Sequence, residues 1–170
     1  MGFLYPFVRH FRAQGWRVDG CSRGATTDPR AIEGFDDVHD LPLSRSVKDV
    51  AGMAQTVRAM QNVVAREYDI VHVHTPIAAF LARAVIRRMP PSRRPKVVYT
   101  AHGFHFHKRG HPIANQAFVL AERVAGRWTD RLVVMNAEDF EAAKRYKIVS
   151  RRRLEYMRGI GVDTQWYAPD

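Results

Sequence analysis

Apolar residues along this chain recur in two alternating spacings, one typical of helices and one typical of short buried strands. The first helix is predicted over residues 4–14, where Leu4, Phe7 and Phe11 lie three or four positions apart. Gly15 follows at the position of a helix C-cap, since glycine adopts the left-handed conformation that ends many helices. The chain is therefore expected to open with a helix.

The later segments continue this alternation. The longest helix is predicted over residues 46–66, with Ser44 or Ser46 as its N-cap. Pro76 suits the first turn of a further helix, and Asn136 is a candidate cap for the last one. Helices are expected over residues 4–14, 46–66, 77–88, 113–126 and 137–146, and strands over residues 17–21, 69–74, 96–100, 131–135 and 154–157.

Strands separated by helices of this length predict an α/β fold, namely a Rossmann-like open parallel sheet with helices on both faces and right-handed crossovers. A domain of this kind normally opens with a strand and a tight turn, whereas this chain begins almost inside its first helix. We therefore expect the usual first strand to be missing and Met1 not to be the original start.

Composition narrows the setting of this domain. The 170 residues suit one domain, and 46% apolar residues are enough for a core. Cys21 is the single cysteine, which excludes an internal disulfide and a Cys-x-x-Cys motif and favours a reducing compartment, the cytoplasm. No segment has the roughly 18–20 uncharged apolar residues of a transmembrane helix, and the apolar first residues lack a signal-peptide cleavage site.

The net charge of +10 predicts an anionic partner, such as a membrane surface, a phosphorylated substrate or nucleic acid. Nucleic acid is disfavoured, because the chain has no helix-turn-helix spacing, zinc finger or aromatic RNP-like strand. Arginines at residues 87–88, 93–94 and 151–153 are either solvated faces or contacts to anionic lipid headgroups. The second interpretation predicts a protein that is peripheral at the inner face of the cell membrane.

Histidines are concentrated in one part of the chain. Six of the eight fall between residues 72 and 111, and five of those lie at or just beyond the ends of the strand segments in residues 69–76 and 96–107. The carboxyl ends of parallel strands meet at one edge of a sheet, and this edge is where open α/β sheets bind ligands. The histidines therefore mark the best candidate site.

Within this group, His102 leaves the end of a strand and Gly103 lets the backbone pass close to a ligand. A neutral imidazole there can hydrogen-bond a ligand hydroxyl or a transition state, or it can simply cap the strand. His72 and His74 point to the same face of one strand, so a zinc cluster is a further hypothesis, although no zinc signature accompanies them. His72 is otherwise expected to be a core histidine bonded to neighbouring backbone, and His74 with Thr75 to line a cleft or to be structural.

The loop from Phe104 to His107 mixes aromatic and imidazole groups and runs into Lys108 and Arg109. One interpretation is a loop that binds a ligand by stacking on a ring and contacting phosphate groups. The other is a mobile basic loop with the aromatic rings of Phe104 and Phe106 packed beneath it. The sequence leaves both open.

Several segments resemble, in order and spacing, the amino-terminal half of a family 4 glycosyltransferase. They are residues 69–76 (DIVHVHTP), 99–106 (YTAHGFHF), Glu122, residues 129–136 (TDRLVVMN) with Glu138 and Asp139, residues 159–164 (GIGVDT) and residues 166–169 (WYAP). The Thr-Ala-His-Gly-Phe-His-Phe segment, followed later by Gly-Val-Asp-Thr, is fairly specific to bacterial members that build surface polysaccharides.

The resemblance implies a GT-B enzyme, in which an amino-terminal domain receives the acceptor and a carboxyl-terminal domain holds a nucleotide-activated sugar. His102 would be catalytic and face the transferred sugar, Asp163 would mark the hinge, and transfer would retain the anomeric configuration. Glu122 would pair with the histidine loop, although by itself it reads equally well as an exposed glutamate. The residues implied to bind substrate are His74, Thr75, Gly103, Phe104, His105 and Glu122. No metal or cofactor is implied beyond the nucleotide-sugar donor.

The chain departs from the family pattern at both ends. It lacks the first strand with its glycine-rich turn, and it stops at Asp170 without the donor domain and its paired-glutamate motif. We expect an acceptor-binding domain over residues 1–158 and the start of an interdomain linker over residues 159–170. The isolated chain is expected not to transfer sugar to a saccharide or lipid-linked acceptor. The alternative is a non-catalytic acceptor-binding subunit or fragment that needs a separate donor-domain partner.

Overall fold

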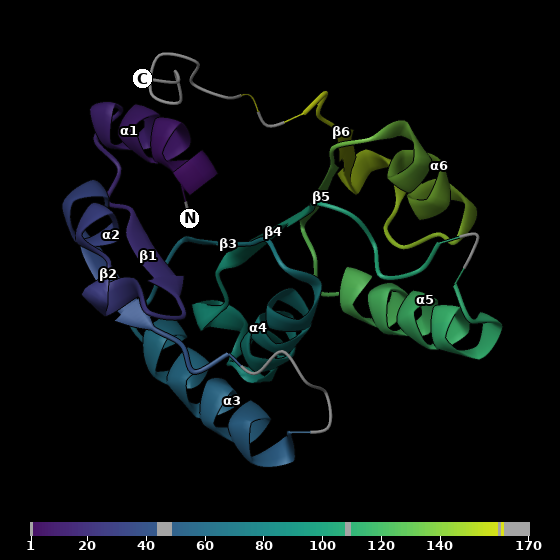
Figure 1. The fold of residues 1–170 in the computed structure, drawn as a ribbon, viewed down its shortest axis with the longest axis horizontal. Helices are drawn as coiled ribbons and strands as arrows, with labels where there is room; N and C mark the ends of the chain where they lie inside the picture. The colour runs from purple at the N-terminus through teal and green to yellow at the C-terminus, as the bar shows by residue number, and fades with distance from the viewer. Residues whose placement is uncertain (1, 44–48, 108–109, 160, 162–170) are drawn as a thin grey trace, which may run out of the picture. The chain divides into compact units, whose positions relative to one another are not determined.

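The computed structural model describes residues 2–43, 49–107, 110–159 and 161 (Figure 1). The chain divides into two compact units, one formed by Met1–Val63 with Ile160–Asp170 and the other by Val64–Gly159. Ser44, Ser46, Lys108, Arg109 and Asp163 lie outside the described residues. No helix among the residues that the structure describes is long and apolar enough to cross a bilayer.

Among the residues that the structure describes, the first unit contains a two-stranded parallel sheet and three α-helices. The strands β1 and β2 pair in register, with Asp19 opposite Asp37. The elements are η1 (Gly2–Leu4), α1 (Tyr5–Ala13), β1 (Asp19–Ser22), η2 (Ala25–Thr27), α2 (Pro29–Gly34), β2 (Asp37–Asp40) and α3 (Val50–Val64), whose last residue passes the unit boundary. The predicted C-cap of the first helix is confirmed, because Gly15 has a left-handed φ of 82°.

A small core holds this unit together. Val8 of α1, Ala31 of α2 and Phe35 are buried against one another, and Leu4 and Tyr5 pack at their edge. Gly20 is needed at the centre of β1, because a Cβ there would come within 2.8 Å of the Phe35 ring.

In this unit the structure has two elements that the sequence did not predict and two elements whose starts differ from the prediction. The helix α2 and the strand β2 were not predicted, since each is too short to show a period. The first strand begins at Asp19 instead of residue 17, and α3 begins at Val50 instead of residue 46. The start of α3 has a physical cause, because the Asp49 carboxylate accepts the backbone N–H of Gly52 at 2.8 Å and so caps the helix.

The second unit contains the larger sheet, in which four parallel strands lie in the order β3-β4-β5-β6. Each strand after the first is preceded by the helix that crosses over to it. The elements are β3 (Ile70–Val73), α4 (Pro76–Arg88), η3 (Pro91–Arg93), β4 (Lys96–Ala101), α5 (Pro112–Gly126), β5 (Arg131–Val134), α6 (Ala137–Arg145), η4 (Arg151–Arg153) and β6 (Leu154–Tyr156). The predicted α/β fold with parallel strands and flanking helices is confirmed (Figure 1).

The two middle strands supply the core of this unit. Tyr99 and Ala101 of β4 and Leu132 and Val134 of β5 are fully buried. The cap predicted for α6 is also present, because the side chain of Asn136 accepts the backbone N–H of Asp139 at 2.7 Å. These features fix the ends of β4 and β5, from which the candidate site is built.

A charged pair lies inside this core. Arg83 of α4 has no exposed surface, and its Nη2 donates to Glu122 Oε2 of α5 at 3.1 Å. Tyr99 Oη donates to Glu122 Oε1 at 3.3 Å, and the Arg83 guanidinium lies 4.3 Å from the centre of the Tyr99 ring. Arg83 also donates to the carbonyl of Ala79 and the hydroxyl of Thr129. Two helices, the strand β4 and the loop residue Thr129 thus meet in one satisfied polar network.

Candidate functional site

Three histidines come together at the carboxyl ends of β3 and β4. His72 lies on β3, His74 follows it, and His102 follows β4. The ring centres of His72 and His74 are 4.2 Å apart, and those of His74 and His102 are 5.4 Å apart. His74 Nδ1 lies 3.2 Å from His102 Nε2, so one of these nitrogens donates to the other. We call these three residues the histidine cluster.

The histidine cluster is anchored to β4 through His72. His72 Nε2 lies 2.8 Å from the hydroxyl of Thr100, a side-chain partner where backbone was expected. His72 keeps part of its surface in solvent and does not belong to the core, because β3 is an edge strand of its sheet, although its ring is packed against Thr100 and His74. One end of the cluster is therefore held at Thr100, and His102 at its other end is exposed.

Burial keeps the histidine cluster neutral. Burial, together with the neighbouring His72 and His102, lowers the pKa of His74 from 6.5 to about 3. Burial also lowers the pKa of His72, with a contribution from His102, and lowers that of His102 itself. At pH 7 the cluster therefore offers hydrogen-bond donors and acceptors instead of positive charges.

Acid is expected to destabilise the chain through His74. Because the pKa of His74 is lower in the folded chain than in the unfolded one, the unfolded state takes up the proton first as the pH falls. The stabilisation is fully present above about pH 6.5 and is lost between about pH 6.5 and 3, by on the order of 2–4 kcal/mol. Urea unfolding at several pH values measures this loss. A His74→Gln variant should show a flatter pH dependence, and an unchanged slope would contradict the assignment.

Two further predicted residues lie beside the histidine cluster in the chain. Thr75 is exposed and precedes α4 as its N-cap residue, although its hydroxyl makes no cap hydrogen bond. Gly103 has a φ of 146°, which side chains rarely adopt, and nothing lies within 4 Å of the place where its Cβ would stand. The backbone after His102 is thus open to an approaching ligand.

The aromatic residues of the following loop are packed inward, which is the second of the two arrangements left open by the sequence. Phe104 and Phe106 are buried and stack on each other, with ring centres 4.8 Å apart. Phe104 is therefore a core residue whose ring face is covered, and its backbone N–H donates to Asp139 at 3.4 Å. His105 is exposed and meets the edge of Phe118 on α5.

Glu122 lies in the interior of the second unit. The interpretation of this residue as an exposed glutamate is wrong, because only 7% of its surface is exposed. Its carboxylate oxygens accept hydrogen bonds from Arg83 and Tyr99. The carboxylate is thus already satisfied by the core, and we interpret Glu122 as a structural residue.

The sequence raised the hypothesis of a metal site at the histidines. The structure brings a different set of side chains within metal-ligand distance of one another. Within the described ranges, the set whose ligand atoms all lie within 4.8 Å of one another is Asp19, Asp37 and His39, on the two strands of the first unit. Arg17 already pairs with Asp19 at 3.1 Å and with Asp37 at 3.9 Å. We interpret this set as a surface ion-pair network, because the guanidinium occupies the carboxylates that a cation would need.

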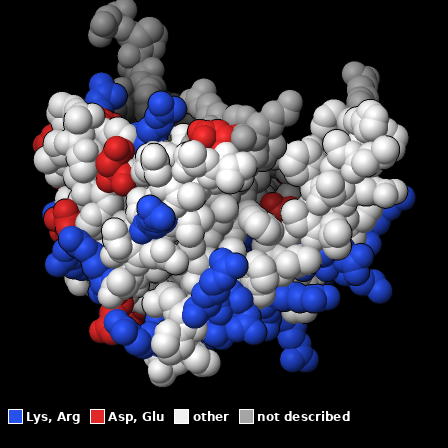
Figure 2. Space-filling view, turned by 90° about the horizontal axis from the view of Figure 1, so that it is seen from below, with Lys and Arg blue, Asp and Glu red and all other residues white. Residues whose placement is uncertain are grey.

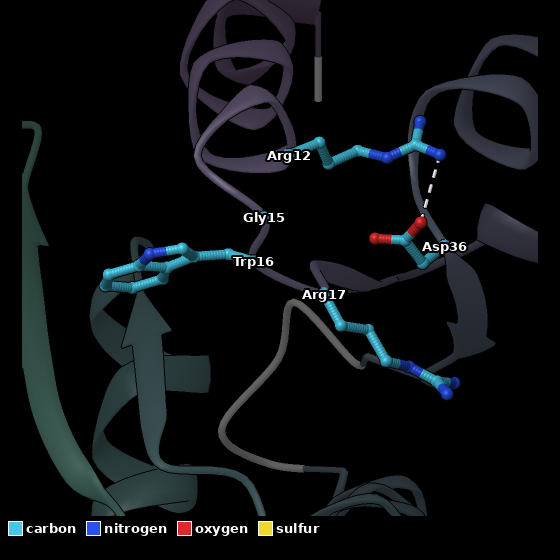
Figure 3. A pocket seen from close by; sticks show the side chains of 5 residues that line it. All are labelled: Arg12, Gly15, Trp16, Arg17 and Asp36. Carbon is cyan, nitrogen blue, oxygen red and sulfur yellow. Dashed lines mark ion pairs between the residues drawn. The ribbon is translucent and has the colours of Figure 1, made fainter.

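A hollow in the first unit is lined by Arg12, Gly15, Trp16, Arg17 and Asp36 (Figure 3). Arg12 and Asp36 form an ion pair at 3.0 Å, and half of the Trp16 surface is exposed. Figure 3 shows the two arginines and Asp36 on one side of the hollow and the indole of Trp16 pointing to the other. The aromatic and polar groups do not converge, so we place the candidate site at the histidine cluster.

Comparison with known proteins adds to this geometry. The model of the Glycosyltransferase Family 4 matches residues 3–165. The chain is 36% identical to the "Putative glycosyltransferase EpsD" of Bacillus subtilis (strain 168) over an alignment of 170 positions, which covers 98% of this chain and 42% of that protein. It is 24% identical over 78 residues to an "Uncharacterized 41.2 kDa protein in cps region" of Klebsiella pneumoniae, covering 45% of the chain and 22% of that protein. The chain thus spans less than half the length of these curated relatives.

A solved structure shares the fold. The sucrose-phosphate synthase of Thermosynechococcus elongatus superposes with a TM-score of 0.61 at 16% sequence identity. The match covers 98% of this chain and 87% of that chain. At this level of identity the similarity concerns the fold alone.

Proposed function

Because this chain belongs to glycosyltransferase family 4 and has a GT-B-type α/β fold, we propose that it is the acceptor-side half of a polysaccharide-building glycosyltransferase. The reaction would transfer a sugar from a nucleotide-sugar donor to a lipid-linked or saccharide acceptor. The histidine cluster carries the proposal, because it gathers neutral hydrogen-bonding groups at the sheet edge where α/β folds bind ligands. The name of the relative EpsD points to the same class of reaction.

His102 is the residue we place against the transferred sugar. It is the exposed end of the histidine cluster, and the open backbone at Gly103 leaves room for a ligand beside it. A neutral imidazole can hydrogen-bond a sugar hydroxyl or the transition state without repelling an oxocarbenium-like charge. A neutral imidazole at His102 therefore suits glycosyl transfer.

His74 would position His102. The 3.2 Å contact between His74 Nδ1 and His102 Nε2 restricts which ring nitrogen of His102 carries the proton. The exposed Thr75 and His105 are the remaining side chains that we place around the acceptor, on either side of His102 in the chain. The buried Phe104 and Glu122 would support this pocket from below instead of contacting the substrate.

The rest of the reaction needs groups beyond these residues. In our proposal, a donor-binding domain of the same or a separate polypeptide supplies the nucleotide-sugar. The protein would act in the cytoplasm and associate peripherally with the anionic inner face of the membrane. The second candidate is a non-catalytic acceptor-binding subunit that needs a separate donor-domain partner.

A reconstitution assay tests the proposal. Sugar transfer from a radiolabelled nucleotide-sugar to a lipid-linked acceptor is measured with this chain alone, with a family donor domain added, and with the two fused. We expect no transfer by the chain alone and transfer when the donor domain is supplied, because the donor and acceptor must meet across a cleft. Acceptor binding without transfer in the fused protein would favour the non-catalytic alternative, and loss of both would contradict the proposed function.

A further inference from the structure

A second cavity, of about 640 Å³, lies in the second unit away from the histidine cluster. Its apolar lining residues are Ile148, Val149 and Leu154, together with Gly126. None of the described residues that line it is acidic. Six lining side chains are cationic, namely Arg123, Arg127, Lys144, Lys147, Arg151 and Arg153. We call this the basic cavity.

The basic cavity lies at the amino ends of β5 and β6, whereas the histidine cluster lies at the carboxyl ends of β3 and β4. Gly126 and Arg127 immediately precede β5, and Leu154 is the first residue of β6. His74 and His102 instead follow the carboxyl ends of β3 and β4. Because all four strands are parallel, the two sites are separate, and an inference from the basic cavity does not rest on the proposed function.

Half of the cations around the basic cavity already have partners. Lys144 pairs with Glu141 at 2.9 Å, and Arg153 donates to the carbonyl of Thr129 at 3.3 Å. Arg151 lies over the ring of Phe140, at 4.9 Å from its centre. These contacts hold the walls of the cavity in place.

The other three cations give the basic cavity positive charge that acidic side chains do not neutralise. Among the described residues, no acidic side chain pairs with Arg123, Arg127 or Lys147. The helices α5 and α6 both end beside this cavity. Cations are common near the carboxyl end of a helix, because they interact favourably with the helix dipole. Six cations from three elements around one cavity, however, exceed what two helix ends need. On the right of Figure 2, where α5 and α6 lie in Figure 1, Lys and Arg gather along the lower margin with no Asp or Glu between them.

The backbone conformation of Lys147 is a further observation in favour of a binding site at this cavity. Lys147 has a φ of 51°, in the left-handed region, and follows Tyr146, the C-cap residue of α6. Glycine is the usual residue at this position, because a side chain is disfavoured in that conformation. A lysine here loses stability relative to glycine and gains a positive charge at the cavity, and backbone strain of this kind often marks a binding site.

We propose that the basic cavity binds a phosphate-bearing ligand through Arg123, Arg127 and Lys147. Guanidinium groups match phosphate oxygens in pairs, and a lysine adds a point charge. The volume lies within the range of small-molecule sites and exceeds what one phosphate fills. The ligand is either the headgroup of an anionic lipid or a soluble diphosphate compound, and both present the same chemistry to these side chains.

The test compares two cavity variants with a matched surface variant in the 170-residue chain. Lys147→Gly and Arg127→Gln each remove one cavity cation, whereas Arg152→Gln removes the exposed arginine between Arg151 and Arg153 that does not line the cavity. Inorganic pyrophosphate binding is measured by calorimetry. Vesicles of phosphatidylcholine, with and without phosphatidylglycerol, are tested by co-sedimentation at low and high salt. We expect each cavity variant to bind about 10-fold more weakly and Arg152→Gln to bind within about twofold of the unchanged chain.

Lys147→Gly separates binding from folding. It should raise the melting temperature, because glycine relieves the left-handed backbone, while it weakens binding. Loss of pyrophosphate binding in the cavity variants supports a soluble ligand, and loss confined to anionic vesicles supports a lipid headgroup. The proposal is overturned if neither probe binds, or if Arg152→Gln weakens binding as much as the cavity variants do. None of these outcomes depends on sugar transfer, so failure here is distinct from failure of the reconstitution assay.

Discussion

Replacement of Glu122 with alanine is expected to lower the free energy of unfolding by about 3–5 kcal/mol, the largest stability change that we predict. The substitution leaves the Arg83 guanidinium fully buried without an opposite charge and removes the acceptor of the Tyr99 hydroxyl. Desolvation of an unpaired charge costs far more than the lost ion pair itself contributes. Urea unfolding followed by circular dichroism measures the change.

A double substitution separates the pair from the packing around it. In Arg83→Met combined with Glu122→Leu, both charges are replaced by apolar groups of similar length, so most of the lost stability should return. If Glu122→Ala alone changes stability by less than about 1 kcal/mol, the pair is open to water and Glu122 is free for a substrate role. The measurement therefore also decides between the structural role that we assign to Glu122 and the acceptor-binding role implied by the family resemblance.

Replacement of His102 with alanine is expected to lower turnover by roughly 10²-fold or more in an enzyme that contains the donor domain. His102 is the exposed member of the histidine cluster, and its imidazole is the group that we place against the developing charge. Because burial lowers its pKa, the ring is neutral near pH 7, and turnover should not depend on its protonation there. Initial rates of sugar transfer measure the effect.

The control for this prediction is His10→Ala, an exposed histidine in α1 of the first unit. It should leave turnover within about twofold and leaves the histidine cluster intact. Circular dichroism of both variants separates lost chemistry from lost folding. Turnover close to that of the unchanged enzyme in a folded His102→Ala variant would reduce His102 to a strand cap, the other interpretation of its position.

Much of the second unit could be predicted from the sequence, because its strands are buried and its helices have clear boundaries. The apolar run Lys96–Ala101 gave a strand with nearly correct ends, and Pro76 and Asn136 marked helix starts that the structure confirms. The gathering of His74 and His102 followed from the rule that parallel strands end at one edge. Periodicity works where one face of each element is buried.

Two elements of the first unit, α2 and β2, escaped prediction, whereas α1, β1 and α3 were predicted with shifted ends. The strand β2 is Asp37–Asp40, in which three of four side chains are polar, and α2 has only six residues. Neither gives an apolar period. One local signal was available, since Asp28 followed by Pro29 is a helix start, and the Asp28 carboxylate accepts the N–H of Arg30.

The buried pair could not be derived from spacing, because Arg83 and Glu122 lie 39 residues apart. Each nevertheless stands as a charge on a helix face that is otherwise apolar. Two such isolated charges of opposite sign, on consecutive helices of a parallel sheet, are a signal for a buried ion pair. The packing of Phe104 beneath its loop had no comparable signal, because an aromatic residue in a glycine-containing loop suits either a core or a surface.

The order of strands in the larger sheet has a consequence for how the protein is made. β3, β4, β5 and β6 neighbour one another in the same sequence in which they occur along the chain. As the ribosome releases the polypeptide, each new strand therefore finds its partner already synthesised, with one helix between them. The sheet can grow by one strand at a time from its first edge, and no strand has to be inserted between two earlier ones.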